Sequence, residues 1–202
     1  MSGRHKEAAR RLHQIAQSQA GFFTTKQAMR AGFDEKTHSY HVKAGNWVRE
    51  HRGIYRLADF PNSERPDLIL WYLWSQNRGE VPEGTYSHET ALSIHELSDV
   101  MPSKLHMTVP KDFRRNSAIP GILILHRANI DSNDIQEMYG VRVTRPLRTI
   151  LDLLRSKQVD DSQLKLAVNE ALRRGVIAKT EIDHASPEDL RRSLRKLAEQ
   201  PA

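Results

Sequence analysis

Three short helix signals followed by a hairpin signal, all within the first 57 residues, constrain most strongly how this chain folds. Apolar residues in segment 4–17 recur at intervals of three and four, which predicts a helix with one buried stripe. Thr24 stands three residues before Gln27, the spacing of a capping box, and Gly32 is placed to end this second helix. A third helix is expected over residues 34–45.

Segment 47–57 has β-forming residues on both sides of a polar turn that contains Gly53, which predicts a hairpin. Three short helices and a hairpin in this order are typical of a winged helix-turn-helix, whose third helix enters the major groove of DNA. Residues 1–60 contain 11 Lys or Arg against 5 Asp or Glu, and residues 61–202 contain 20 of each. The whole net charge of +6 therefore belongs to the first segment. Charge alone fits a solvated face equally well, but together with the fold it favours nucleic-acid binding.

Two rotations of the third helix about its axis fit the sequence, and they bury different faces. The first buries Phe33, Thr37, Tyr40 and Ala44, and the second buries His38, His41 and Val42. Both rotations leave Lys36, Ser39 and Lys43 outward, because these residues recur at helical spacing. In the hairpin, cations near the turn are placed to meet phosphates, which supplies affinity without sequence information. The residues predicted to contact DNA are Lys36, Ser39, Tyr40, Lys43, Arg49, His51 and Arg52.

The rest of the chain mixes helix and strand signals, so the predicted fold class is α+β. We expect helices over 68–76, 87–97, 145–154 with Thr144 as cap, 161–174 and from Ser186 onward, and strands over 105–109, 121–126 and 141–143. The turn-rich linker Ala58–Pro66 indicates a domain boundary. We predict a winged helix-turn-helix domain over 1–60, an α+β domain over 61–157, and a helical extension over 158–202 packed on the latter.

Several classes of protein are disfavoured by what the sequence lacks. The chain has no cysteine, which excludes disulfides, zinc fingers and iron–sulfur clusters. Its longest apolar run, Leu68–Trp74, has seven residues, whereas a membrane span needs roughly 20. No apolar stretch follows the charged N-terminus as in a signal peptide, so we expect a cytoplasmic protein with no membrane partner.

Residues that suggest enzymatic chemistry are scattered. His88-Glu89 resembles the start of the zinc-protease helix, but Leu92 stands where the second histidine is required. His88 and His95 are seven residues apart and form only a weak metal signal, so structural or partner-facing roles are favoured. Asp131, Asp134 and Asp152 are not paired by the sequence as a two-metal nuclease site. We therefore expect no enzyme, no metal and no cofactor.

Two further basic segments lie outside the first 60 residues. Lys111, Arg114 and Arg115 follow a predicted strand in a loop that is suited to contact nucleic acid, although a solvated loop is more common. The predicted last helix carries Arg191, Arg192, Arg195 and Lys196, and its role is left open.

Short blocks of the sequence resemble the AbiEi-like antitoxins of type IV abortive-infection toxin–antitoxin systems. In the first segment these blocks are Gly32-Phe33, Lys43 to Arg49 and Arg52 to Arg56, and in the body they are Tyr86 to Leu92, Leu105 to Pro110 and Val141 to Leu153. The order and spacing of the blocks carry the resemblance, which spans about residues 20–155. It implies a first domain that binds double-stranded operator DNA and represses its own operon. It also implies an antitoxin-type body that counteracts a nucleotidyltransferase-like toxin, by direct contact or otherwise.

The chain departs from the family pattern on the third helix. Family members often carry several arginines there, where this chain has Lys36, Ser39, Tyr40 and Lys43. The resemblance thus implies an unusual operator sequence or a larger share of the affinity in the hairpin. The family pattern has aliphatic residues at the positions of His38 and His41, which favours the rotation that exposes Tyr40. The alternatives are a winged-helix regulator without a toxin and, less favoured, a nuclease delivered to DNA by its first domain.

Overall fold

The computed structural model describes residues 3–61, 63–99, 101–157 and 159–199. Its fold is α+β, as the sequence predicts. The chain divides into two compact units, Met1–Glu83 with Tyr139–Val141, and Gly84–Met138 with Arg142–Ala202. Compactness does not show which segment folds by itself, so the predicted domain limits at residues 60 and 157 stay predictions. No helix within the described ranges is long and apolar enough to cross a membrane.

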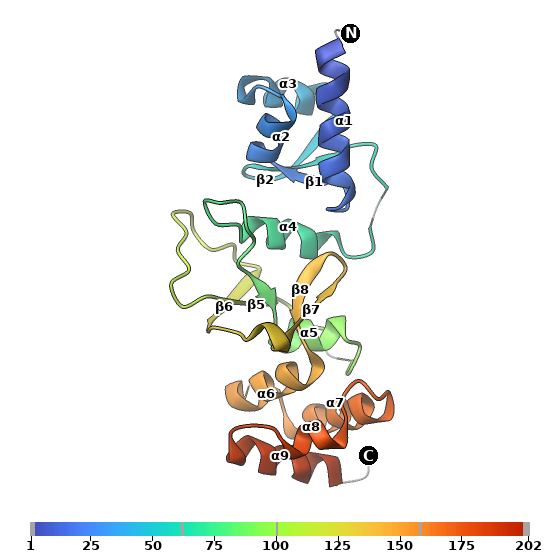
Figure 1. Ribbon diagram of the computed structural model, residues 1–202, viewed down its shortest axis with the longest axis vertical. Helices are drawn as coiled ribbons and strands as arrows, with labels where there is room; N and C mark the ends of the chain where they lie inside the picture. Colours follow the sequence, from blue (N-terminus) through green and yellow to red (C-terminus); the bar gives the residue numbers. More distant parts are fainter. Residues whose placement is uncertain (1–2, 62, 100, 158, 200–202) are drawn as a thin grey trace. The chain divides into compact units, whose positions relative to one another are not determined.

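The first unit is a winged helix-turn-helix followed by one further helix (Figure 1). Its elements are α1 (Gly3–Gln17), β1 (Phe22–Thr24), α2 (Thr25–Ala31), the 3-10 turn η1 (Glu35–Thr37), α3 (His38–Lys43), β2 (Trp47–His51), β3 (Ile54–Leu57) and α4 (Pro66–Trp74). The three strands form an antiparallel sheet in the order β1-β3-β2. The predicted hairpin is confirmed, and β1, which the sequence analysis did not predict, is its third strand.

Local signals explain the helices of the first unit. The predicted capping box is confirmed: the Gln27 amide donates to Thr24 Oγ1 at 3.3 Å, and the Thr24 amide donates to Gln27 Oε1 at 2.8 Å. Gly32 ends α2 with a φ of +113°, a conformation that glycine adopts without strain. The stripe of α1 is buried through Ala8, Leu12 and Ala16. The third helix begins as η1 and continues as α3, within the predicted range.

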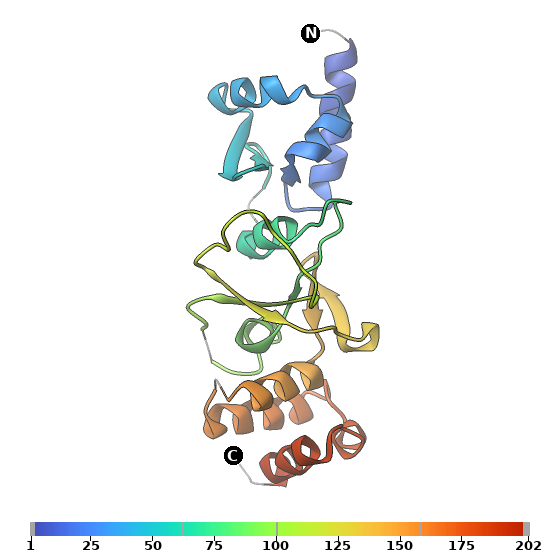
Figure 2. The ribbon, with the colours of Figure 1, turned by 90° about the vertical axis from the view of Figure 1, so that its left-hand side faces the viewer.

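Among its described residues, the second unit combines a mixed sheet with five helices. Its elements are β4 (Thr85–Tyr86), α5 (His88–Ile94), β5 (Leu105–Val109), β6 (Leu123–Arg127), the 3-10 turn η2 (Ser132–Asp134), β7 (Ile135–Met138), β8 (Val141–Thr144), α6 (Pro146–Ser156), α7 (Asp161–Arg173), α8 (Lys179–Asp183) and α9 (Glu188–Glu199). The strand order is β6-β5-β4-β8-β7. β4 is antiparallel to β5 and parallel to β8, and β5 is parallel to β6 (Figure 2).

Some predicted boundaries of the second unit were wrong. The N-cap of α6 is Arg145, because Thr144 still belongs to β8 and its hydroxyl lies 2.7 Å from the hydroxyl of Thr149. The helix predicted to extend to residue 97 ends at Ile94. The short elements β4, β7 and α8 were not predicted.

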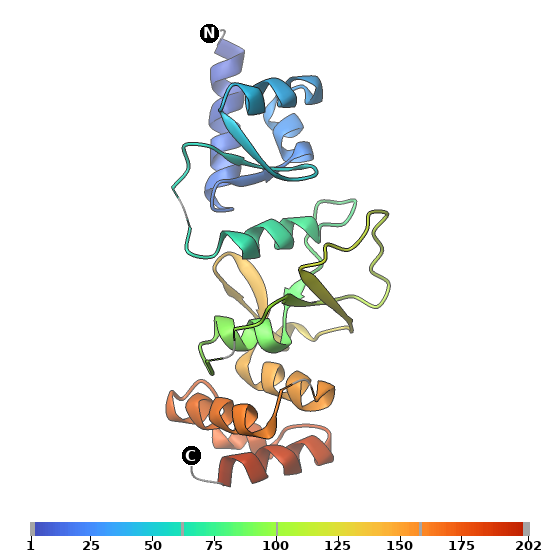
Figure 3. The same cartoon turned by 180° about the vertical axis from the view of Figure 1, so that it is seen from behind.

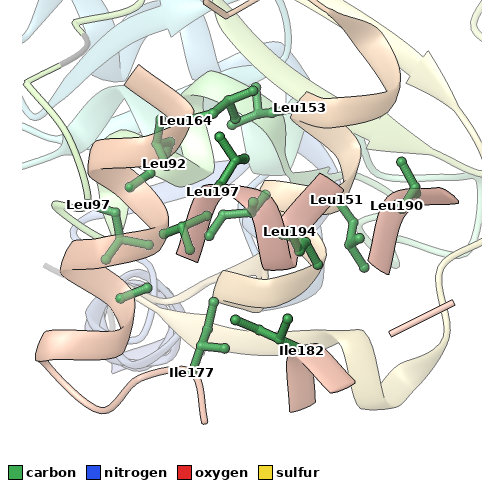
Figure 4. Packing of buried hydrophobic residues seen from close by; sticks show 14 of the residues in the cluster. Leu92, Leu97, Leu151, Leu153, Leu164, Ile177, Ile182, Leu190, Leu194 and Leu197 are labelled. Atoms are coloured by element: carbon green, nitrogen blue, oxygen red, sulfur yellow. The ribbon is translucent and has the colours of Figure 1, made fainter. Parts of the chain in front are cut away.

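One apolar core joins the helices of the second unit. Leucines of α5, α6, α7 and α9 face one another around Leu194, which is 1% exposed (Figure 4). Ile177 and Ile182 contribute to the same cluster from the segment between α7 and α9. The last three helices therefore share a core with α5 and α6, and burial of each leucine contributes roughly 1.5–3 kcal/mol.

Candidate nucleic-acid interface

The rotation of α3 is settled by the burial of its two histidines. His38 is 3% exposed and His41 is 6% exposed, whereas Tyr40 is 66% exposed. The rotation that buries histidines and exposes Tyr40 is therefore the one present. Lys36, Ser39 and Lys43 are exposed as well. The four residues predicted on this helix all lie at the surface.

The turn before α3 fixes the residue at which the third helix begins. The Asp34 carboxylate accepts the Lys36 amide at 3.0 Å, which caps η1 as the sequence predicts. α3 then has six residues, so it is about 9 Å long at 1.5 Å per residue. The helix ends at Lys43 with Ala44 as its C-cap, and Gly45 follows with a φ of +75°. A short, exposed helix bounded on both sides suits insertion into a groove.

The hairpin turn is held close to the body of the first unit. The amide of Thr25 donates to the Gly53 carbonyl at 2.9 Å, which ties the turn to the start of α2. Arg49 and Arg52 are exposed beside this turn. His51 is half-buried, and its ring meets that of Trp71 in α4 edge-on with centroids 5.1 Å apart. Of the three predicted hairpin contacts, the two arginines are the accessible ones.

The cations of the first unit fall into paired and unpaired groups. Arg30 pairs with Glu80, Arg11 pairs with Glu7, and Arg56 donates to Glu50 at 2.8 Å. The cations of the predicted interface make no ion pair with any described residue. They are Lys36 and Lys43 on the third helix, and Arg49 and Arg52 in the hairpin. Unpaired positive charge thus remains on the predicted interface, where phosphates would be bound.

The first turn of α1 lies beside α3, a contact that was not predicted from the sequence. The His5 ring lies 5.7 Å from Phe33 and 5.8 Å from His41, measured between centroids. Arg4 and Lys6 flank this histidine in the sequence. The available signal was the position of His5 three residues before Ala8, which extends the buried stripe of α1 by one turn.

In the second unit, three histidines gather where the sequence analysis suspected only His88. The His88 ring is stacked on His126 with centroids 3.6 Å apart, and His106 Nδ1 lies 3.1 Å from His126 Nε2. Burial, together with the neighbouring imidazoles, lowers the pKa of His88 to about 3 and that of His126 to about 4. Among the described residues, no group of three or more His, Asp or Glu is arranged to hold a metal.

The other chemically suggestive residues take structural positions. His95 Nε2 lies 2.7 Å from the Thr144 carbonyl oxygen, which ties α5 to β8. Asp131 caps η2 by accepting the Asn133 amide at 2.8 Å. Asp134 and Asp152 do come together, but each accepts a 2.9 Å hydrogen bond from Arg148. A guanidinium occupies the position between these carboxylates.

The two remaining basic segments are held in place differently. In the loop after β5, Phe113 is buried, and Arg127 donates to the carbonyls of Lys111 and Phe113 at 3.3 and 2.8 Å. In α9, Arg191 pairs with Glu188, and Arg195 pairs with Asp183 at 2.7 Å. Part of the positive charge of α9 is therefore neutralised within the second unit.

Comparisons with known proteins bear mainly on the first unit. Residues 10–58 match the family model described as "Transcriptional regulator, AbiEi antitoxin", which confirms the predicted resemblance for this segment. None of the curated proteins matches the chain. The crystal structure of the RV2827C protein from Mycobacterium tuberculosis is similar with a TM-score of 0.61 at 11% identity, over 96% of this chain and 76% of that one. At this identity the likeness shows the fold alone, and the resemblance of the body blocks stays a prediction.

Proposed function

We propose that this protein is an antitoxin of the AbiEi type that binds operator DNA through its first unit and represses its own operon. The observation that carries the proposal is the surface formed by α3 and the hairpin. Six of the seven predicted contact residues are exposed there, and four of them are cations without an ion pair among the described residues. The segment that matches the AbiEi regulator family contains all seven of these residues.

The length of α3 bears on the form of the operator. The third helix is about 15 Å long, because η1 adds three residues at about 2 Å each to the 9 Å of α3, and it spans about four base pairs, which stack at about 3.4 Å. One first unit therefore reads too little sequence to select a promoter by itself. We propose that the operator contains repeated short elements, each bound by one copy of the protein.

Replacing cations of this surface should weaken binding to the DNA upstream of the gene. We expect Lys43→Ala combined with Arg52→Ala to lower the affinity at least tenfold, because two phosphate contacts are lost. Four bound cations predict a slope of about −3.6 in log affinity against log salt, and the double variant should lose about half of it. Fluorescence anisotropy with a labelled duplex at several salt concentrations measures both quantities.

The matched control is Arg30→Ala, which removes a cation of the same unit that is already paired with Glu80. This variant should keep most of the affinity and the salt slope of the unchanged protein. Undiminished binding by the double variant would remove α3 and the hairpin as the DNA contact surface.

We propose that the second unit counteracts a nucleotidyltransferase-like toxin encoded beside the gene, in the cytoplasm. If the two functions lie on different units, Lys43→Ala with Arg52→Ala should lose repression while still restoring growth of cells that express the neighbouring toxin. The measurement is growth with antitoxin supplied from an independent promoter. Failure of both the variant and the unchanged protein to restore growth would favour a stand-alone regulator.

A further inference from the structure

The buried face of α3 consists of two imidazoles. Figure 3 shows α3 beside α1 in the first unit, with the strands of the hairpin below it. His38 and His41 supply its buried surface, and no other residue of α3 is as deeply buried. An imidazole resembles an apolar ring only while it is neutral, because its protonated form requires hydrogen-bond partners or water.

His41 joins α3 to two other elements. One face of its ring stacks on Trp47 of β2 with centroids 4.5 Å apart and an interplanar angle of 21°. His5 of α1 stacks on it at 5.8 Å and 13°, and Phe33 meets its edge at 5.0 Å. Its Nδ1 lies 3.4 Å from the side-chain nitrogen of Asn46. The ring therefore fixes the distance of α3 from both α1 and the hairpin.

The imidazole of His38 is buried against aromatic side chains. Its ring is edge-on to Trp47 at 5.2 Å and to Tyr55 at 5.7 Å. Neither ring nitrogen has a hydrogen-bond partner among the described residues. A proton added here would place a charged ring with two unsatisfied N–H groups against aromatic side chains, which disfavours the docked position of α3.

The charged and titratable groups around the two rings do not make their protonation favourable in the folded unit. Burial lowers the pKa of His38 more than Glu35 and Asp34 of the preceding turn raise it. Burial also lowers the pKa of His41, and His5 and His38 lower it further. β2 and β3 contribute the rings of Trp47 and Tyr55 to these contacts. Both rings are therefore neutral in the folded unit at neutral pH.

We infer that His38 and His41 are positioning residues for DNA recognition, and that α3 is held in its DNA-reading position only while both rings are neutral. The inference rests on the proposed function. Because both pKa values lie below the ordinary 6.5, an undocked α3 takes up protons more readily than a docked one between those values and 6.5. Acid thus shifts α3 away from the docked position, and DNA binding weakens as the pH falls through this window.

The sign of this effect is diagnostic. Protonation of accessible histidines adds positive charge and strengthens binding to phosphates, so an ordinary basic protein binds DNA more tightly in acid. Here we expect the opposite for the full-length protein and a duplex from its own upstream region, at constant ionic strength. Between pH 6.5 and 5.5 the affinity should fall, and linkage sets tenfold per pH unit as the upper limit for each proton that must be taken up.

The deciding variant is His38→Leu combined with His41→Phe, which keeps apolar volume at residue 38 and a flat ring on Trp47. Its affinity at pH 7.5, where both rings of the unchanged protein are neutral, is the reference for its own pH profile. Toward pH 5.5 its affinity should rise instead of fall. His13→Gln, on the exposed side of α1, is the matched control and should keep the original pH profile.

The possible outcomes separate this inference from the proposed function. Binding by the unchanged protein that strengthens steadily toward pH 5.5 overturns the inference and leaves the proposed function intact. No binding of the duplex at any pH removes the proposed function, and NMR of the free full-length protein then decides the inference. Loss of α3 amide protection as His38 and His41 protonate supports it, and an unchanged α3 with both rings protonated overturns it. The same NMR measurement decides the question if the double variant does not fold.

Discussion

Arg148 illustrates how a single side chain organises the segment from Val141 to Leu153. Its guanidinium donates to Asp152 on the same helix and to Asp134 beside β7, both at 2.9 Å. Asp152 is buried, and its second carboxylate oxygen has no hydrogen-bond partner among the described residues. The hydrogen bonds of Arg148 thus hold α6 against the segment that precedes β7 in the second unit.

Removing Arg148 should therefore strongly destabilise the second unit. We expect Arg148→Ala to lower the free energy of unfolding by about 3–5 kcal/mol, because it leaves a buried carboxylate nearly uncompensated. Arg155→Ala is the matched control: this side chain is 46% exposed and lies 3.7 Å from Asp152, so its loss should cost less than about 1 kcal/mol. Urea unfolding of both variants measures the difference, and equal losses would contradict the role given to Arg148.

The pH dependence of this variant follows from the same contacts. Burial raises the pKa of Asp152, and Arg148 lowers it, so removing the arginine raises the pKa further. A carboxyl whose folded-state pKa lies above its unfolded value stabilises the fold as the pH falls. The difference in unfolding free energy between Arg148→Ala and the unchanged protein should therefore be smaller at pH 5 than at pH 7.

At the scale of elements, the sequence predicted those structures that depend on neighbouring residues. The capping box of α2, the stripe of α1 and the β2–β3 hairpin are set by residue types a few positions apart. The strands β1, β4 and β7 have two to four residues each, too few to show a period. β1 and β4 are strands because of partners far along the chain, whereas β7 lies beside β8, the strand that follows it. In β1, for example, Phe22 pairs with Arg56.

The residues of the predicted interface also divide into those whose exposure follows from local spacing and those whose burial depends on distant contacts. Exposure of Lys36, Ser39 and Lys43 followed from helical spacing, because both rotations of the helix agreed on it. The rotation itself depended on histidine, a residue type that is found both inside and outside proteins, and the ring of Trp47 decides it. His51 is half-buried because its ring packs against Trp71 of α4, and no local sequence pattern connects this helix to the hairpin.

At the scale of the whole molecule, buried imidazoles occur in both units. His38 and His41 lie in the first unit, and His88, His95 and His106 lie in the second, with His126 half-buried beside them. Burial is the largest cause of the lowered pKa in each of these six histidines. The folded protein therefore excludes protons that its unfolded chain accepts, and this property is shared by the two units.

We expect stability to fall as the pH decreases from about 6.5. For each histidine whose folded-state pKa is depressed, the unfolded state holds up to one more proton between that pKa and 6.5, which costs about 1.4 kcal/mol per pH unit. Glu89 and Asp152, whose pKa values are raised by burial, act in the opposite sense, so the test is confined to pH 7.5 to 5. Thermal unfolding should show a melting temperature that is constant above pH 7 and decreases steeply below pH 6.5.

His126→Gln should make the decrease in melting temperature less steep, because it removes the imidazole stacked on His88. His184→Gln, at an exposed position, should leave the decrease unchanged. An equal melting temperature at pH 7 and pH 5 would contradict the neutral, buried state of these rings.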